Sequence, residues 1–265
     1  MKKILLGWFM TALFSTSIVH AAESTKLRIG IDGAYPPFGQ VGANGQLQGF
    51  DVDIAKALCE EIKAQCTLIS QDFDAMIPSL QSRKLDAIVA SMSITEERKK
   101  AVDFTDKYYQ SPNYFIAKAG TALVVTPVGL KGKRIGVQRT TIHDRFVTDV
   151  FKDSAIVRYT KQDEVYLDLA AGRIDCALLD AAAAGAGFLN TPAGKGFTFT
   201  GPSFSEPKYF GAGIGIAVRK NNNTLRDKLN TAIKTIRSNG TYQKIQDKYF
   251  NFDIYNGAVA IPAKK

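Results

Sequence analysis

The sequence predicts an α/β protein of two similar lobes, the second of them inserted into the first. Three observations support this prediction. Short apolar runs alternate with segments of helical period, the pattern of βα units in a largely parallel sheet. Two blocks of sequence recur downstream in the same order. Two further stretches, one apolar and one rich in Gly and Pro, have the composition of segments that cross between lobes.

The first half of the chain reads as strands and helices in alternation. A strand over residues 27–31 is followed by a turn over 32–38, and a helix spans about residues 51–63, because its apolar side chains recur on one face. The remaining elements are predicted as a strand over 67–70, a helix over 75–83, a strand over 85–90 and a helix that Thr95 caps and that runs through Lys100.

The second half repeats parts of the first. Residues 28–32 (RIGID) match residues 134–138 (RIGVQ), and residues 80–87 match residues 169–176. Chance similarity between two βα units is the alternative. Two matched blocks in the same order favour two similar lobes.

The repeat pairs polar residues at the ends of predicted strands. Asp32 is aligned with Gln138, and Ser91 is aligned with Asp180. Open parallel sheets bind ligands beyond the carboxyl ends of their strands. With two lobes facing each other, we expect these four side chains to surround one cleft.

The crossing segments set the expected lobe boundaries. Residues 108–117 are expected to run extended between the lobes and residues 201–215 to return. The final helices, about 224–238 and 242–250, then pack on the first lobe. Lobe 1 is expected to comprise residues 23–111 and 207–265, and lobe 2 residues 112–206.

The N-terminus has the features of a secretory signal. Lys2 and Lys3 precede an apolar stretch over residues 4–19, and His20-Ala21-Ala22 ends in small residues. These features predict a cleaved signal over residues 1–22 and export to the periplasm, with a retained anchor as the alternative. No Cys stands at the expected cleavage point to carry a lipid anchor, and no later segment is apolar enough to span a membrane.

Composition restricts the partner classes. The formal net charge is +9, but Lys and Arg are scattered, which favours solvated helix faces over a nucleic-acid surface. No Cys/His cluster has metal-ligand spacing, so neither a metal nor another cofactor is expected. Cys59 and Cys66 lie near each other and form a plausible disulfide pair in an oxidising compartment, whereas Cys176 is expected to be a buried free thiol.

Six motifs together resemble a known family. They are GFDVDI (49–54), FDAMIP (73–78), SMSITEER (91–98), DFT (103–105), AGRID (171–175) and NGTY (239–242). They are similar to the polar-amino-acid solute-binding proteins of ABC importers, closest to the lysine/arginine/ornithine- and histidine-binding proteins. The resemblance implies a type II periplasmic-binding-protein fold with two crossover strands, a monomer that closes by a hinge without catalysis, membrane permease subunits as partners, and a Cys59–Cys66 disulfide.

The resemblance also implies how an amino acid carboxylate is held. Arg98 matches the family's carboxylate-binding arginine, and a guanidinium can hold a carboxylate bidentately. The alternative role for Arg98 is that of an ordinary solvated arginine on the helix surface. Ser93 is expected to add a hydroxyl, and Thr141 begins a helix whose free N–H groups form an anion site.

Two aspartates are expected to meet the positive groups of the ligand. Asp180, with Ser91, matches the family's α-ammonium site, and a helix N-cap is a role that it can hold at the same time. Asp32 matches the acid that the family's receptors for basic amino acids use as counter-charge to the side chain. Its alternative is a turn-forming aspartate. Tyr35 and Phe73 are expected to sandwich the ligand, although bare aromatic residues are more often core.

Departures from the family pattern leave the ligand open. Ala90 stands where basic-amino-acid receptors often have a second serine, and Gln138, Ile142 and His143 replace Leu, Thr and Gln. His143 is expected to contact the ligand or the hinge, or to lie on the helix surface. Arginine is the first candidate, and lysine, ornithine, histidine or an opine are alternatives.

The predicted function is that of a periplasmic receptor that passes a cationic amino acid to an importer. An enzyme on the same fold, a periplasmic dehydratase of cyclohexadienyl acids, is the main rival. It needs a general acid beside a leaving hydroxyl, and no spare Glu falls in a matched position. A receptor-kinase sensor domain is a second rival, which the absence of a signalling module in this sequence disfavours.

Overall fold

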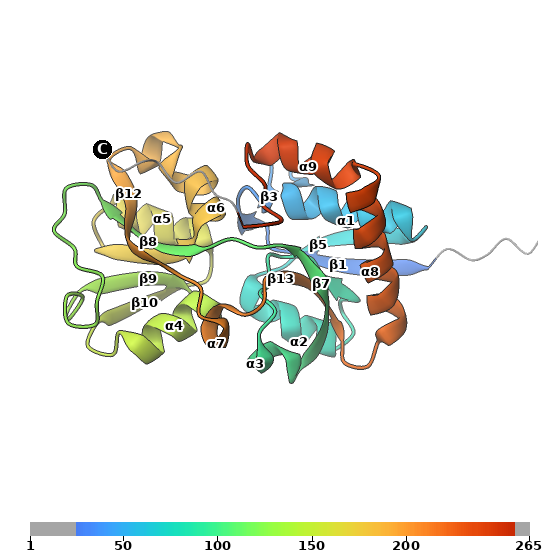
Figure 1. The fold of residues 1–265 in the computed structure, drawn as a ribbon, viewed down its shortest axis with the longest axis horizontal. Coiled ribbons are helices and arrows are strands. Elements are labelled where there is room, and N and C mark those ends of the chain that lie inside the picture. The colour runs from blue at the N-terminus through green and yellow to red at the C-terminus, as the bar shows by residue number, and fades with distance from the viewer. Residues whose placement is uncertain (1–24, 258–265) are drawn as a thin grey trace, which may run out of the picture.

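The computed structural model describes residues 25–257, so the expected signal over residues 1–22 and its cleavage site lie outside the described part of the chain. Figure 1 shows two lobes side by side, joined by segments that cross between them. Each lobe contains one five-stranded sheet with helices on both faces. The predicted two-lobed α/β fold is therefore confirmed. Within residues 25–257, no helix is long and apolar enough to cross a bilayer.

The first sheet has the strand order β5-β1-β6-β13-β7. Its strands are β1 (Lys26–Ile31), β5 (Gln65–Ser70), β6 (Ala87–Ile88), β7 (Val102–Tyr109) and β13 (Ile214–Arg219). β1 pairs in parallel with β5 and β6, whereas β13 is antiparallel to β6 and β7. Because β13 follows the second lobe in sequence, this sheet joins chain segments from both sides of the insertion.

Apolar side chains at successive positions of these strands point to opposite faces of the sheet, so they contribute to two separate cores. One face packs against α1 (Phe50–Glu61), α8 (Asn223–Ser238) and α9 (Thr241–Tyr249). The other face packs against η1 (Phe73–Ala75), α2 (Met76–Gln81) and the segment that leads from β6 to α3 (Glu96–Lys99). The Thr95 cap of α3 is confirmed, since its side chain accepts a hydrogen bond from the backbone N–H of Arg98.

The expected turn over residues 32–38 contains the first strand of a small sheet that extends to residue 48. The sheet consists of β2 (Ala34–Tyr35), β3 (Gly39–Val41) and β4 (Leu47–Gln48), all antiparallel. Strands of two or three residues carry no alternation long enough to predict. This small sheet presents Tyr35 beside the carboxyl end of β1.

The second sheet has the equivalent order, β10-β9-β11-β8-β12. Its strands are β8 (Asn113–Lys118), β9 (Arg134–Gln138), β10 (Ala155–Tyr159), β11 (Cys176–Asp180) and β12 (Phe197–Phe204). β9 is parallel to β10 and β11, as β1 is to β5 and β6, and β8 is antiparallel to β11 and β12. The first repeated block therefore lies in equivalent strands, β1 and β9, and the second leads from the end of a helix into equivalent strands, β6 and β11.

Helices also cover both faces of the second sheet. α4 (Ile142–Val150) and α7 (Pro207–Phe210) contribute to one core. α5 (Gln162–Ala170), α6 (Ala181–Ala184) and the π-helical η2 (Gly185–Leu189) contribute to the other, and η3 (Pro192–Gly194) follows η2.

The crossings are shorter than expected. β7 continues to Tyr109 and β8 begins at Asn113, so only residues 110–112 pass between the sheets and the expectation of residues 108–117 was too long. Tyr108 and Phe115 are fully buried in the cores of their own lobes, which is why the strands extend to the crossing. The return crossing begins after Phe204 and includes α7.

The Cys59–Cys66 disulfide is confirmed and joins the end of α1 to β5. Cys176 is a free, buried thiol in β11, as the apolar run around it predicted.

Candidate functional site

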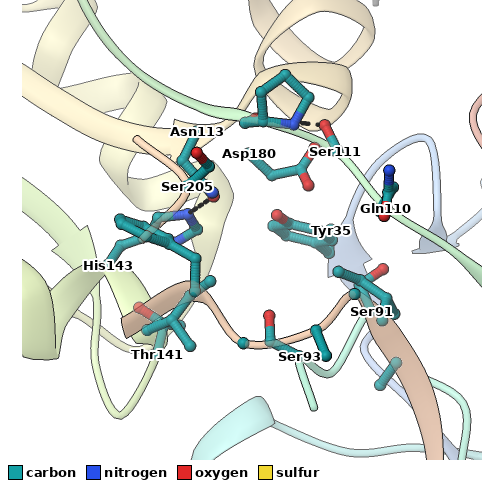
Figure 2. A pocket seen from close by; sticks show the side chains of 18 of the residues that line it. Tyr35, Ser91, Ser93, Gln110, Ser111, Asn113, Thr141, His143, Asp180 and Ser205 are labelled. Atoms are coloured by element: carbon teal, nitrogen blue, oxygen red, sulfur yellow. Dashed lines mark hydrogen bonds between the residues drawn. The ribbon is translucent and has the colours of Figure 1, made fainter. Parts of the chain in front are cut away.

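A cavity of about 350 Å³ lies between the carboxyl ends of the two sheets, within the size range of small-molecule sites. All twelve residues predicted to bind ligand line it: Asp32, Tyr35, Phe73, Ala90, Ser91, Ser93, Arg98, Gln138, Thr141, Ile142, His143 and Asp180. Figure 2 shows Asp180, Ser111 and Gln110 on one side of the cavity and Thr141 and Ser93 on the opposite side.

Strand ends position the polar residues aligned by the repeat. Asp32 follows β1 and Ser91 follows β6, while Gln138 and Asp180 are the last residues of β9 and β11. Because β1 is parallel to β6 and β9 is parallel to β11, each pair leaves its sheet at the same edge. The two edges face each other across the cavity.

Arg98 supplies the positive charge of the site. Its guanidinium donates to the backbone oxygen of Ser93 at 3.1 Å and to that of Thr140, in the other lobe, at 3.4 Å. It also lies 5.2 Å from the centroid of the Phe73 ring. Removal from water lowers the pKa of Arg98 to about 10. Among residues 25–257 no carboxylate pairs with it, so the guanidinium can still receive an anion.

Asp180 is a buried carboxylate with two backbone donors. Its Oδ1 accepts hydrogen bonds from the N–H groups of Ala182 at 2.9 Å and Ala183 at 3.0 Å, which makes it the N-cap of α6. Burial raises its pKa to about 6. No Lys or Arg of the described chain pairs with it, so the carboxylate also lines the cavity without a counter-ion.

Asp32 is bound from both lobes. Its Oδ1 accepts from the N–H of Ala34 at 3.0 Å, and its Oδ2 accepts from the Nε2 of Gln138 at 3.2 Å. It is 5% exposed, and burial raises its pKa to about 6. The turn-forming role and the cavity-lining position therefore coexist. As with Asp180, the described residues offer it no cation.

Gln138 has a fixed orientation. Its Nε2 lies 3.2 Å from two acceptors, the Oδ2 of Asp32 and the backbone oxygen of Thr160. Only the amide nitrogen can donate to both, so this end of the amide must be NH₂. The Oε1 atom is therefore the acceptor end of the amide.

His143 is buried against Asn113, directly after the crossing over residues 110–112, which we call the hinge. The alternative that placed it on the helix surface is therefore wrong. His143 is 7% exposed, and its Nε2 lies 2.7 Å from the Oδ1 of Asn113. The Nδ2 of Asn113 donates to the backbone oxygen of Phe204, which leaves Oδ1 as the acceptor and puts the proton on Nε2. Burial, aided by Arg98, lowers the pKa of His143 to about 3, so the ring is neutral.

The helix after β9 begins where it was expected. Thr141 is the N-cap of α4, and its side chain accepts from the N–H of Asp144. Ile142 and His143 form the first turn, so their backbone N–H groups point out of the helix start toward the cavity that they line.

Sequence reasoning missed several residues of the site. The short crossings place Gln110, Ser111, Asn113, Ser205 and Phe210 on the cavity wall. The crossings were predicted, but a segment expected to be extended gives no signal for which side chains turn inward. Asp51, whose carboxylate binds the hydroxyl of Ser91 at 2.8 Å, was also missed.

Comparison with known proteins gives one family. The model of the bacterial extracellular solute-binding proteins, family 3, matches residues 27–252. An L-arginine-binding protein of Pseudomonas aeruginosa is 49% identical over 258 residues, 96% of this chain and 99% of that protein. A histidine-binding periplasmic protein of Salmonella typhimurium is 44% identical over 97% of this chain and 100% of its own length.

A solved structure supports the same relationship. A periplasmic binding protein of Salmonella typhimurium, described for its high arginine specificity, is 33% identical with a TM-score of 0.79. The match covers 86% of this chain and 100% of that structure.

Proposed function

The chain belongs to the bacterial extracellular solute-binding proteins of family 3, and from this premise we propose that it is the periplasmic receptor of an ABC importer for a cationic amino acid. The charge balance of the cavity carries this proposal. Arg98 contributes one unpaired positive charge, and Asp32 and Asp180 contribute two unpaired negative charges among the described residues. A cationic amino acid has the complementary set: one carboxylate, one α-ammonium and one charged side chain.

We propose a set of partners for each ligand group. The ligand carboxylate meets Arg98, Ser93 and the start of α4 at Thr141, the α-ammonium meets Asp180, and the side chain extends toward Asp32. Tyr35 and Phe73 flank the aliphatic part. An unpaired charge is costly to bury, so a ligand that lacks any one of these groups leaves a charged side chain without a partner.

Arginine is the first candidate within this class. A guanidinium has five N–H donors in a planar fork, whereas an ammonium is a compact point charge. The two oxygens of the Asp32 carboxylate can accept from such a fork bidentately. Two of the compared proteins, from Pseudomonas aeruginosa and Salmonella typhimurium, are named for arginine.

Binding is proposed to close the lobes without catalysis. We propose that lobe 1 comprises residues 23–111 and 207–265 and lobe 2 residues 112–206. The division of the strands between the two sheets agrees with this, although α7 (Pro207–Phe210) packs in the core of the second lobe. The contacts of Gln138 with Asp32 and of Arg98 with Thr140 form only when the lobes are close. Closure presents both lobes together to the permease subunits, and the receptor acts as a monomer. A cleaved signal over residues 1–22 delivers it to the periplasm.

The dehydratase alternative lacks a candidate acid. Among the described residues that line the cavity, the only carboxylates are Asp32 and Asp180, and both are needed as counter-charges. Turnover of prephenate or arogenate by the purified protein would contradict the binding-only function.

A thermal-shift panel on ligand-stripped protein tests the proposal. The panel contains arginine, lysine, ornithine, histidine, octopine, glutamate, glutamine and leucine. A ligand at 1,000 times its dissociation constant stabilises by about 4.1 kcal/mol, so a true ligand gives a large shift. Cationic members should stabilise the protein, arginine most. Stabilisation by glutamate or leucine alone would mean that the role of Asp32 is wrong.

A further inference from the structure

Asp51 is a buried carboxylate directly behind the cavity wall. It lies in the first turn of α1 and is 1% exposed. Its Oδ1 accepts a hydrogen bond from the hydroxyl of Tyr108 at 2.7 Å, and its Oδ2 accepts one from the Oγ of Ser91 at 2.8 Å. Asp51 does not line the cavity, but Ser91 does.

The direction of each hydrogen bond follows from the number of protons. The backbone N–H of Ser91 donates to the hydroxyl oxygen of Tyr108 at 3.2 Å, so the single proton of Tyr108 is free to go to Asp51. Ser91 likewise has one hydroxyl proton, and the carboxylate of Asp51 takes it. The Oγ of Ser91 therefore has only lone pairs left to offer the cavity.

The backbone conformation of Ser91 indicates that this residue is held in one orientation. Its φ is 53°, in the left-handed region that non-glycine residues seldom adopt. Two hydrogen bonds hold Ser91 in this conformation, one from its N–H to Tyr108 and one from its hydroxyl to Asp51. Burial raises the pKa of Asp51 to about 7, and the bonds from Tyr108 and Ser91 oppose that rise by stabilising the charged form.

We propose that Asp51 is a positioning residue that turns the Ser91 hydroxyl so that it presents an acceptor, and not a donor, to a positively charged group of the ligand. This inference rests on the proposed function. Ammonium and guanidinium groups can only donate, so a hydroxyl proton aimed at them would replace attraction by repulsion. The same arrangement disfavours a ligand that places a carboxylate or carbonyl oxygen against Ser91.

A double-mutant cycle between Asp51 and Ser91 tests the proposal. Arginine dissociation constants are measured by calorimetry at pH 8, where Asp51 is ionised, for the full-length mature protein and the variants Asp51→Asn, Ser91→Ala and the double variant. In Asp51→Asn the amide oxygen accepts from Tyr108 and the amide nitrogen faces Ser91, whose proton must then turn into the cavity. We expect arginine to bind about 10- to 100-fold more weakly, the range of a hydrogen bond to a charged group.

The cycle separates positioning from a purely structural role. If Asp51 acts through Ser91, the double variant binds arginine no more weakly than Ser91→Ala alone. Asp53→Asn is the matched control, because Asp53 lies in the same first turn of α1 but binds Lys248 and Tyr249 and has no bond to Ser91. It should change the arginine dissociation constant less than about 3-fold.

Two results would overturn the inference. One is wild-type affinity for arginine in a folded Asp51→Asn variant. The other is an equal loss of affinity on Asp51→Asn in the wild-type and Ser91→Ala backgrounds. Should Asp51→Asn fail to fold, Asp51→Glu decides, since a retained carboxylate should keep arginine affinity within about 10-fold. Failure of the wild-type protein to bind any cationic amino acid would be a separate result, against the proposed function.

Discussion

Gln138 and Asp32 belong to different lobes, and the amide Nε2 of Gln138 donates a hydrogen bond to the Oδ2 of Asp32 at 3.2 Å. This part of the cavity wall is thus completed only when the lobes meet. Asp32 brings negative charge from the end of β1, and Gln138 brings a neutral amide donor from the end of β9. Under the proposed assignment, recognition of the ligand side chain and closure of the protein use the same atoms.

Arg98→Ala should weaken binding of every amino acid ligand, since all of them share the carboxylate. Loss of a bidentate charge-assisted pair predicts a dissociation constant at least about 100-fold higher for arginine and lysine alike. Calorimetry of the two ligands measures this. Lys99→Ala is the matched control, because Lys99 is the next residue of α3 and forms an ion pair with the exposed Glu96. An Arg98→Ala variant that binds either ligand normally would refute the carboxylate assignment.

Asp32→Asn should weaken arginine and at the same time stabilise the ligand-free protein. Burial raises the pKa of the Asp32 carboxyl to about 6, so its protonated form contributes to the free energy of unfolding at low pH. This contribution is lost as the pH rises through about 6. At pH 8 the neutral amide avoids that loss. We expect a higher melting temperature without ligand and about 10- to 100-fold weaker arginine binding.

Asp163→Asn, on the exposed first turn of α5, is the control for general charge effects near Asp32. It should leave both quantities nearly unchanged. Unaltered arginine affinity in Asp32→Asn would show that the ligand side chain lies elsewhere.

Arginine affinity should fall as the pH drops below about 6. Asp32 and Asp180 both have pKa values of about 6 in the ligand-free cavity, and a bound cation favours their ionised forms. Binding is therefore strongest above pH 7. At pH 5 each carboxyl group must lose a proton at a cost of up to about tenfold in affinity, which predicts a total loss of one to two orders of magnitude.

Calorimetry at pH 6 in two buffers of different ionisation enthalpy gives a second readout of the same effect. Arginine binding should release protons there. A dissociation constant that is flat between pH 5 and pH 8, with no proton release, would mean that neither carboxyl group meets the ligand.

The ion pair between Arg139 and Asp74 should act as a weak latch between the lobes. The Nε of Arg139 lies 2.6 Å from the Oδ2 of Asp74, with the Arg139 side chain 45% exposed. Exposed pairs contribute about 0.2–1 kcal/mol. Asp74→Asn should raise the arginine dissociation constant no more than about 5-fold. Small-angle scattering should show no change in the compactness of the arginine-saturated variant, and a much larger loss of affinity would mean that the pair supports the site directly.

Much of this architecture could be predicted from the sequence, because it is encoded in patterns that repeat. Residues 28–32 and 134–138 share one block and belong to equivalent strands of the two sheets. Residues 80–87 and 169–176 share the other, which leads from the end of a helix into equivalent strands. Polar residues at the ends of those strands line one cavity, since strand direction alone determines the edge at which they leave the sheet.

Other features depend on contacts that no local pattern records. The bond of Ser91 to Asp51 joins residues 40 positions apart, and GFDVDI gives no sign that its first aspartate is buried. The hinge role of His143 depends on Asn113, 30 positions away, whose own partner is Phe204. The strands of the β2–β4 sheet are too short to show alternation.

The most direct test of the charge balance is a comparison of arginine with citrulline, measured by calorimetry on ligand-stripped protein at pH 7.5. Citrulline has the same length, carboxylate and α-ammonium as arginine, but a neutral urea replaces the guanidinium. The two ligands therefore differ only at the end of the side chain, where citrulline lacks the positive charge and has an oxygen in place of one NH₂ donor. We predict that arginine binds at least about 100-fold more tightly, the equivalent of roughly 2.7 kcal/mol. Equal affinities for the two ligands would contradict the assignment of Asp32 as counter-charge and, with it, the cationic class of ligand.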